Sequence, residues 1–153
     1  MRARRFLFGI ALCLVAAVCY GSDPTMGTWK LNQAKSKIPH GMGKNQKVVY
    51  EAAGDHVKVT IDGVDAEGKP AHNEWTGKFD GNDYPVTGSS QEDARAVKKI
   101  NDYTYTVTLK KDGQPAGMGR IVIDPDGKSR TVTIMRSGPD GKQVTSRSVY
   151  DKR

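Results

Sequence analysis

Residues 103–110 read Tyr-Thr-Tyr-Thr-Val-Thr-Leu-Lys, and their strict alternation decides the class of fold. Aromatic or aliphatic side chains stand at the odd positions, and Thr or Lys stands at every even position. Successive side chains of a β-strand point to opposite faces of a sheet, so this period of two predicts a half-buried strand. Threonine and tyrosine also favour the pleated surface of a sheet. We expect one face of this strand to line a core.

The same alternation recurs along the chain, whereas helical periodicity is almost absent. The alternation is found in residues 57–62, 75–79 and 129–134. We interpret the irregular stretch 89–99 as a loop leading into a strand. The segments between strands carry an acidic residue before glycine, a pair that supplies the positive backbone angles of tight hairpins. These pairs stand at 62–63, 67–68, 80–81, 112–113, 126–127 and 140–141.

The last three turn glycines, Gly113, Gly127 and Gly141, are 14 residues apart each time. A hairpin turn uses about four of those residues, which leaves strands of roughly ten residues running up and down, about eight to ten in all. So large an antiparallel sheet must close or split into two packed sheets, because its edges and its apolar face need cover. We predict an all-β, antiparallel up-and-down β-barrel of about 8–10 strands, with a β-sandwich as the alternative.

The first 21 residues differ from the rest. A basic start precedes an apolar run from Phe6 to Val18, a combination typical of a secretory signal peptide. We therefore predict a signal peptide at residues 1–21 and a single barrel domain at residues 22–153, exported to the periplasm or secreted. The apolar run is too short to cross a bilayer comfortably, so no transmembrane segment is expected in the mature chain. A membrane tether is expected only if Cys19 is lipidated.

Composition narrows the classes of function. The sequence has 153 residues, with 24 Lys and Arg against 17 Asp and Glu, a net charge of +7. Removing the leader removes three arginines and no acidic residue, so 21 basic residues face 17 acidic ones and the charge falls to +4. This mild excess does not favour nucleic-acid binding. Both cysteines, Cys13 and Cys19, lie within the leader, which leaves the mature domain without a disulfide or a thiol nucleophile.

No spacing of residues indicates catalysis, a metal or a cofactor. His40, His56 and His72 are 16 residues apart, so no pair has the i, i+2 or i, i+4 spacing of metal ligands. The run Asp-Pro-Asp-Gly at 124–127 begins like a calcium loop, but Lys128 stands at the next ligand position. Neither a phosphate-binding glycine loop nor a Ser-His-Asp constellation can be identified. We expect a protein without enzymatic activity, cofactor or metal.

Residues 26–32 read Met-Gly-Thr-Trp-Lys-Leu-Asn at the start of the first expected strand. With this Gly-x-Trp motif the chain resembles the lipocalins and their relatives the fatty-acid-binding proteins, which are small up-and-down barrels. The glycine lets the strand enter under the base of the barrel, and Trp29 closes that end. The resemblance implies an arginine from a late strand across Trp29, with Arg147 as the first candidate and Arg136 as the second.

Residues 145–152 resemble the last strand of the fatty-acid-binding proteins, in which an arginine and a tyrosine two positions apart hold a ligand carboxylate. Here Arg147 and Tyr150 are three positions apart, so on a regular strand they face opposite ways and the clamp is broken unless a bulge intervenes. The helical lid of that family is also missing, because residues 33–46 contain Pro39 and two glycines and resemble a loop.

The resemblance implies a lipocalin-like protein that binds or carries a small apolar ligand in the cell envelope. The expected ligand-binding residues are Trp29, Trp75, Phe79, Tyr103, Tyr105, Arg147 and Tyr150. The alternative is a filled barrel that acts through its surface, as an interaction module or as an inhibitor of an envelope partner. An apolar cavity of several hundred Å³ favours the carrier. A packed interior with an exposed apolar patch favours the interaction module.

Overall fold

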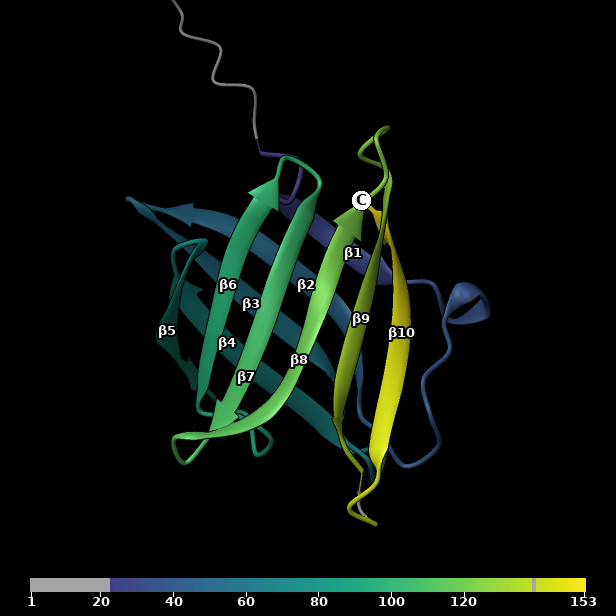
Figure 1. Cartoon of the computed structure of the whole chain (residues 1–153). Helices are drawn as coiled ribbons and strands as arrows, with labels where there is room; N and C mark the ends of the chain where they lie inside the picture. Colours follow the sequence, from purple (N-terminus) through teal and green to yellow (C-terminus); the bar gives the residue numbers. More distant parts are fainter. Residues whose placement is uncertain (1–22, 139) are drawn as a thin grey trace, which may run out of the picture.

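Ten antiparallel strands close into a barrel in a computed structural model of the chain, which describes residues 23–138 and 140–153 (Figure 1). The strands are β1 (Gly27–Leu31), β2 (Lys44–Ala53), β3 (His56–Val64), β4 (Pro70–Gly77), β5 (Asp80–Thr87), β6 (Ala94–Asn101), β7 (Thr104–Lys111), β8 (Gln114–Ile123), β9 (Ser129–Ser137) and β10 (Gln143–Lys152). One short 3₁₀ helix, η1 (Gln33–Lys35), precedes the loop that leads to β2. The expected signal peptide and the lipidation of Cys19 fall outside the described residues.

Each strand pairs with its neighbours in sequence, and β1 closes the barrel by pairing with β10 as well as with β2. In this closure Trp29 lies opposite Lys152 on β10 and opposite Val48 on β2. The shortest strand pairing is between β4 and β5, where only two residue pairs are in register, Glu74–Thr87 and Trp75–Val86. The observed order confirms the up-and-down barrel of eight to ten strands and excludes the sandwich.

The alternation in residues 103–110 sorts side chains as expected over most of its length. Tyr105, Val107 and Leu109 of β7 are buried in the core, whereas Thr108 between them is exposed. Tyr103 is the exception, because it lies in the turn before β7 and is 41% exposed. The prediction that Tyr103 lines the interior was therefore wrong: a side chain in a turn is not held to the face that the strand parity assigns.

The evenly spaced glycines do form turns. Gly113, Gly127 and Gly141 have φ angles of 75°, 69° and 75°, a left-handed region that glycine enters without steric cost. Gly63 is different, because it lies within β3 and not in the turn that its Asp-Gly pair predicted. A Cβ on Gly63 would lie 2.0 Å from the carbonyl oxygen of Lys44, so this glycine permits a close approach of β2, which bulges at that point.

Candidate ligand-binding cavity

Trp29 closes one end of the barrel, which we call the base. The indole is fully buried and donates a hydrogen bond of 2.8 Å from Nε1 to the carbonyl oxygen of Thr25. The guanidinium carbon of Arg130 lies 4.6 Å from the centre of its ring, and Tyr50 and Tyr150 flank the same guanidinium at 4.8 and 5.1 Å. Three aromatic faces around one cation give attractive cation–π contacts.

Arg130, and not Arg147 or Arg136, is thus the arginine across Trp29. Arg147 lies outside the barrel, where it donates to the carbonyl oxygen of Lys35 at 3.1 Å and to the hydroxyl of Thr131. The prediction of Arg147 as the closing residue was wrong. The separation of Arg147 and Tyr150 onto opposite faces is confirmed, because Tyr150 is 3% exposed and Arg147 is exposed.

The residues before β1 tie the base together through Asp23. Its carboxylate accepts a hydrogen bond of 2.7 Å from the hydroxyl of Tyr105 and contacts Lys99 Nζ at 3.1 Å. Burial opposes the ionisation of Asp23, but hydrogen bonds from Thr25, Tyr105 and Lys99 outweigh it and lower the pKa of this carboxyl. Burial, together with the hydrogen bond to Asp23, raises the pKa of Tyr105 to about 12.

Above the base lies a cavity of about 80 Å³ inside the barrel. We call it the interior cavity. Its walls are aliphatic and come from β2, β3 and β6–β9: Val48, Val59, Ile61, Val97, Val107, Leu109, Ile121, Val132 and Ile134. An apolar cavity of about 150 Å³ holds benzene, and one water occupies about 30 Å³ of liquid. The interior cavity therefore admits only a small group, and it falls short of the several hundred Å³ that we expected of a carrier.

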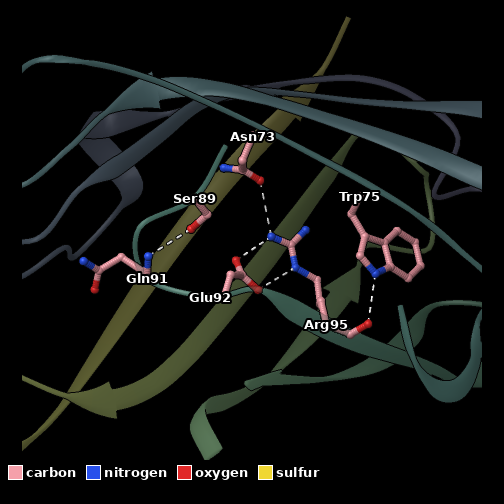
Figure 2. A network of polar contacts seen from close by, with 6 residues as sticks. All are labelled: Asn73, Trp75, Ser89, Gln91, Glu92 and Arg95. Carbon is pink, nitrogen blue, oxygen red and sulfur yellow. Dashed lines mark hydrogen bonds and ion pairs between the residues drawn. The ribbon is translucent and has the colours of Figure 1, made fainter. Parts of the chain in front are cut away.

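At the other end the interior cavity is lined by the charged side chains Glu92, Arg95 and Arg136. Together with Asn73, which accepts a hydrogen bond from Arg95, we call them the polar mouth. Figure 2 shows the guanidinium of Arg95 between Glu92 and Asn73. Its Nη2 lies 2.5 Å from Glu92 Oε1 and its Nε lies 3.0 Å from Oε2, a two-point ion pair of residues that are 7% and 8% exposed. Trp75 fixes the backbone there, because its Nε1 donates to the carbonyl oxygen of Arg95 at 2.9 Å.

Arg136 completes the polar mouth from β9. Its Nε is buried and has no hydrogen-bond partner among the described residues. Burial lowers the pKa of this guanidinium, with Glu92 opposing and Arg95 reinforcing the effect. The polar mouth therefore contains a neutral ion pair and one further positive charge.

The expected ligand-binding residues divide into three groups. Trp75 and Tyr150 line the interior cavity. Phe79 and Tyr105 pack with their ring centres 5.1 Å apart, and together with Trp29 they do not line it. Tyr103 and Arg147 lie outside the barrel.

The arginines and the glutamate that line the cavity were not among the expected ligand-binding residues, although their positions carried a signal. Arg130 and Arg136 share the parity of Val132 and Ile134 on β9 and thus the inward face. Arg95 likewise shares the parity of Val97 on β6. A charged residue in phase with buried aliphatic residues is the pattern that identifies such a group. Glu92 precedes β6, so no strand parity indicated its direction.

Two features lie outside the interior cavity. A surface groove of about 310 Å³ is lined by the loop at residues 38–42, by Lys44, by the last residue of β3, Val64, and by the β3–β4 turn. The large exposed apolar side chains are Ile100, Tyr103, Met118 and Val122. In the part of the chain that the structure describes, no three His, Cys, Asp or Glu side chains gather where a metal ion would fit. None of its helices has the length and apolar character needed to cross a membrane.

Comparisons with known proteins add a likeness of shape alone. No protein-family model and no curated protein matches the sequence. Among solved structures, the chain is similar to a redesigned β-barrel, mFAP1, bound to DFHBI. The two share 12% sequence identity over 85% of this chain and 95% of that chain, with a TM-score of 0.43. A score this low carries no argument about function, and the likeness to lipocalins and fatty-acid-binding proteins remains a resemblance of motifs.

Proposed function

We propose that this protein binds a small ligand with an apolar part inside its barrel, without catalysis, after export to the cell envelope. The observation that supports the proposal is the interior cavity itself, which is walled by aliphatic side chains and ends in buried charged groups. A site with apolar walls and a few placed polar groups is the usual form of a small-molecule site. Export is proposed from the signal peptide that the sequence predicts at residues 1–21.

Charged groups inside the barrel support binding over mere filling of a core. Arg130 is 2% exposed, and its Nε and Nη1 have no hydrogen-bond partner among the described residues. A buried charge without a counter-ion lowers stability, and an aliphatic side chain in its place would fill a purely structural core at no such cost. Such groups cluster at functional sites.

The size of the interior cavity sets the size of the ligand. At about 80 Å³ the cavity accepts a group smaller than benzene, so retinoid-sized molecules are not expected. Native mass spectrometry of the protein purified from the cells that produce it tests for a bound small molecule directly.

A matched pair of variants tests where such a ligand lies. Val132 lines the interior cavity, and Val122 stands on the outer face of β8 with 39% exposure. Val132→Phe should fill the cavity and abolish the binding of a small neutral probe such as butanol, followed by NMR. Val122→Phe should leave binding unchanged. Absence of probe binding to the wild-type protein, or binding that survives in Val132→Phe, would refute the proposal.

A second candidate function is an interaction module that acts through its surface. The small cavity favours it, as do three exposed apolar side chains: Ile100 near the end of β6, Tyr103 in the β6–β7 turn and Val122 of β8. This function predicts that Tyr103→Ser abolishes capture of an envelope partner, whereas Val132→Phe has no effect on capture.

A further inference from the structure

The charges that line the interior cavity do not balance. Among the described residues that line it, Arg95, Arg130 and Arg136 are cationic, and Glu92 is the single carboxylate. Both oxygens of Glu92 already contact Arg95 at 2.5 and 3.0 Å. The cavity thus has two guanidinium groups in excess of its carboxylate.

The two excess guanidiniums differ in their surroundings. Arg130 lies between three aromatic rings, all within 5.1 Å of its guanidinium carbon, and these rings partly replace the hydration that it lost. Arg136 has no aromatic ring over its guanidinium within the described residues, and its buried Nε has no acceptor. Arg136 is therefore the group with most to gain from an added anion.

The stem of Arg136 packs closely against β8, beside the aliphatic wall of the interior cavity. Its neighbour on β8 is Gly117, which has no side chain to cover the guanidinium stem. A Cβ placed on Gly117 would lie 3.0 Å from the carbonyl oxygen of Met135, 3.2 Å from Arg136 Cβ and 3.3 Å from Leu109 Cδ1, so glycine lets the stem lie this close to β8. The polar mouth thus places the cation of Arg136 next to the aliphatic wall of the cavity.

We propose that the ligand is a small organic oxyanion whose acid group binds Arg136 at the polar mouth while its short apolar part enters the interior cavity. This inference rests on the proposed function and adds the chemical class of the ligand. A guanidinium offers planar paired donors that match the oxygens of a carboxylate or a phosphate. The volume of about 80 Å³ limits the buried part to fewer atoms than benzene has.

The base of the barrel is a less suitable place for this anion than the polar mouth. Arg130 and Tyr150 lie together at the base, but the Tyr150 hydroxyl donates to the carbonyl oxygen of Asn45 at 3.0 Å, and Arg130 is covered by rings. Glu92 lines the same cavity as Arg136 and raises the pKa of its guanidinium, so it competes with an incoming anion. Glu92 therefore sets how strongly the polar mouth attracts that anion.

Butanoate and butanamide provide the test, because they have the same shape and differ in charge. Both are titrated into the isotope-labelled protein at constant ionic strength and followed by NMR. Butanoate should bind at least about tenfold more tightly than butanamide, since a hydrogen bond to a charged group contributes about that factor. Arg136→Gln should remove this preference, and Arg136→Lys should retain part of it. Arg120→Gln, an exposed arginine on β8, is the matched control and should retain all of it.

Glu92→Gln gives a readout that a purely structural role of the mouth would not produce. Loss of the competing carboxylate should tighten butanoate binding several-fold and leave butanamide binding unchanged. Equal affinities for the two compounds, or a preference that persists in Arg136→Gln, would overturn the anion site and leave the proposed function standing. Binding of neither compound, together with no binding of butanol, would overturn both proposals.

Discussion

The ion pair between Glu92 and Arg95 should stabilise the barrel only as a pair. In Glu92→Gln the guanidinium of Arg95 remains buried at 8% exposure, and its side-chain partners become neutral amide oxygens, that of the new glutamine and that of Asn73 at 3.4 Å. Arg136 at the same time loses the carboxylate that raises its pKa. Breaking one partner of a buried ion pair costs about 3–5 kcal/mol of unfolding free energy, and we expect a loss of about 3 kcal/mol.

Replacing both charges should restore most of this loss. Arg95→Met added to Glu92→Gln removes the orphaned cation and puts an apolar side chain of similar length against the aliphatic wall. Because a buried pair exchanged for apolar groups is often close to neutral, the double variant should lie within about 1–2 kcal/mol of wild type. The coupling energy in the double-mutant cycle should then be about 2 kcal/mol or more.

Urea unfolding followed by tryptophan fluorescence measures these differences, with the linear dependence on denaturant extrapolated to water. The ion pair between Asp83 and Lys110 is the matched control, since its atoms are also 2.5 Å apart but its side chains are 41% and 34% exposed. Asp83→Asn should cost less than about 1 kcal/mol, because water screens an exposed pair. A loss below about 1 kcal/mol for Glu92→Gln, no larger than that of Asp83→Asn, would refute the reasoning.

Three further predictions concern the base of the barrel. Hydrogen bonds hold the pKa of Asp23 below its ordinary value of 3.8. The contribution of Asp23 to stability is therefore complete above pH 3.8 and disappears as the pH falls through the lower pKa of the folded state. The urea midpoints of wild type and Asp23→Asn should differ at pH 7 and converge near about pH 2. Burial raises the pKa of Tyr105 and of Tyr150 to about 12, so their stabilising effect is lost as the pH rises from about 10 through 12. In ultraviolet titration of the folded protein at about pH 11, the phenolate signal should lack these two tyrosines, and Tyr105→Phe should lower the late step. Arg130→Lys keeps the charge but loses the planar stacking on Trp29, so it should lower the free energy of unfolding by about 1–3 kcal/mol. Arg147→Lys on the outer surface should change that free energy by less than about 0.5 kcal/mol. Equal effects of the two variants in thermal unfolding would contradict the assignment of Arg130 as the closing arginine.

Local patterns were sufficient to predict the strands and the closure of the barrel. The period of two in β7 assigns Tyr105 and Leu109 inward because strand geometry leaves a side chain only two faces to choose from. Equal spacing of Gly113, Gly127 and Gly141 predicts strands of equal length, and such strands pair in sequence order. The same local logic failed for Gly63, where an Asp-Gly pair inside β3 serves the close approach of another strand.

The contacts of the interior site could not be predicted from the sequence, because they join residues on different strands. Parity along β9 assigns Arg130 and Arg136 to the inner face but does not give their height in the barrel. Trp29 lies on β1 and Arg130 lies on β9, two strands that β10 separates. Their contact follows from the stagger of strands around a closed sheet, which couples residues that no spacing in the sequence relates.

The sequence by itself therefore determined the fold class, the inward and outward faces of the strands and most of the turns, since each follows from chemistry within a few residues of chain. Tertiary structure alone decided that Arg130 covers Trp29, that Glu92 pairs with Arg95, and that the lumen retains about 80 Å³. These features depend on the register around the barrel and on how side chains from many strands fill one volume. Packing of that kind is a property of the whole closed sheet.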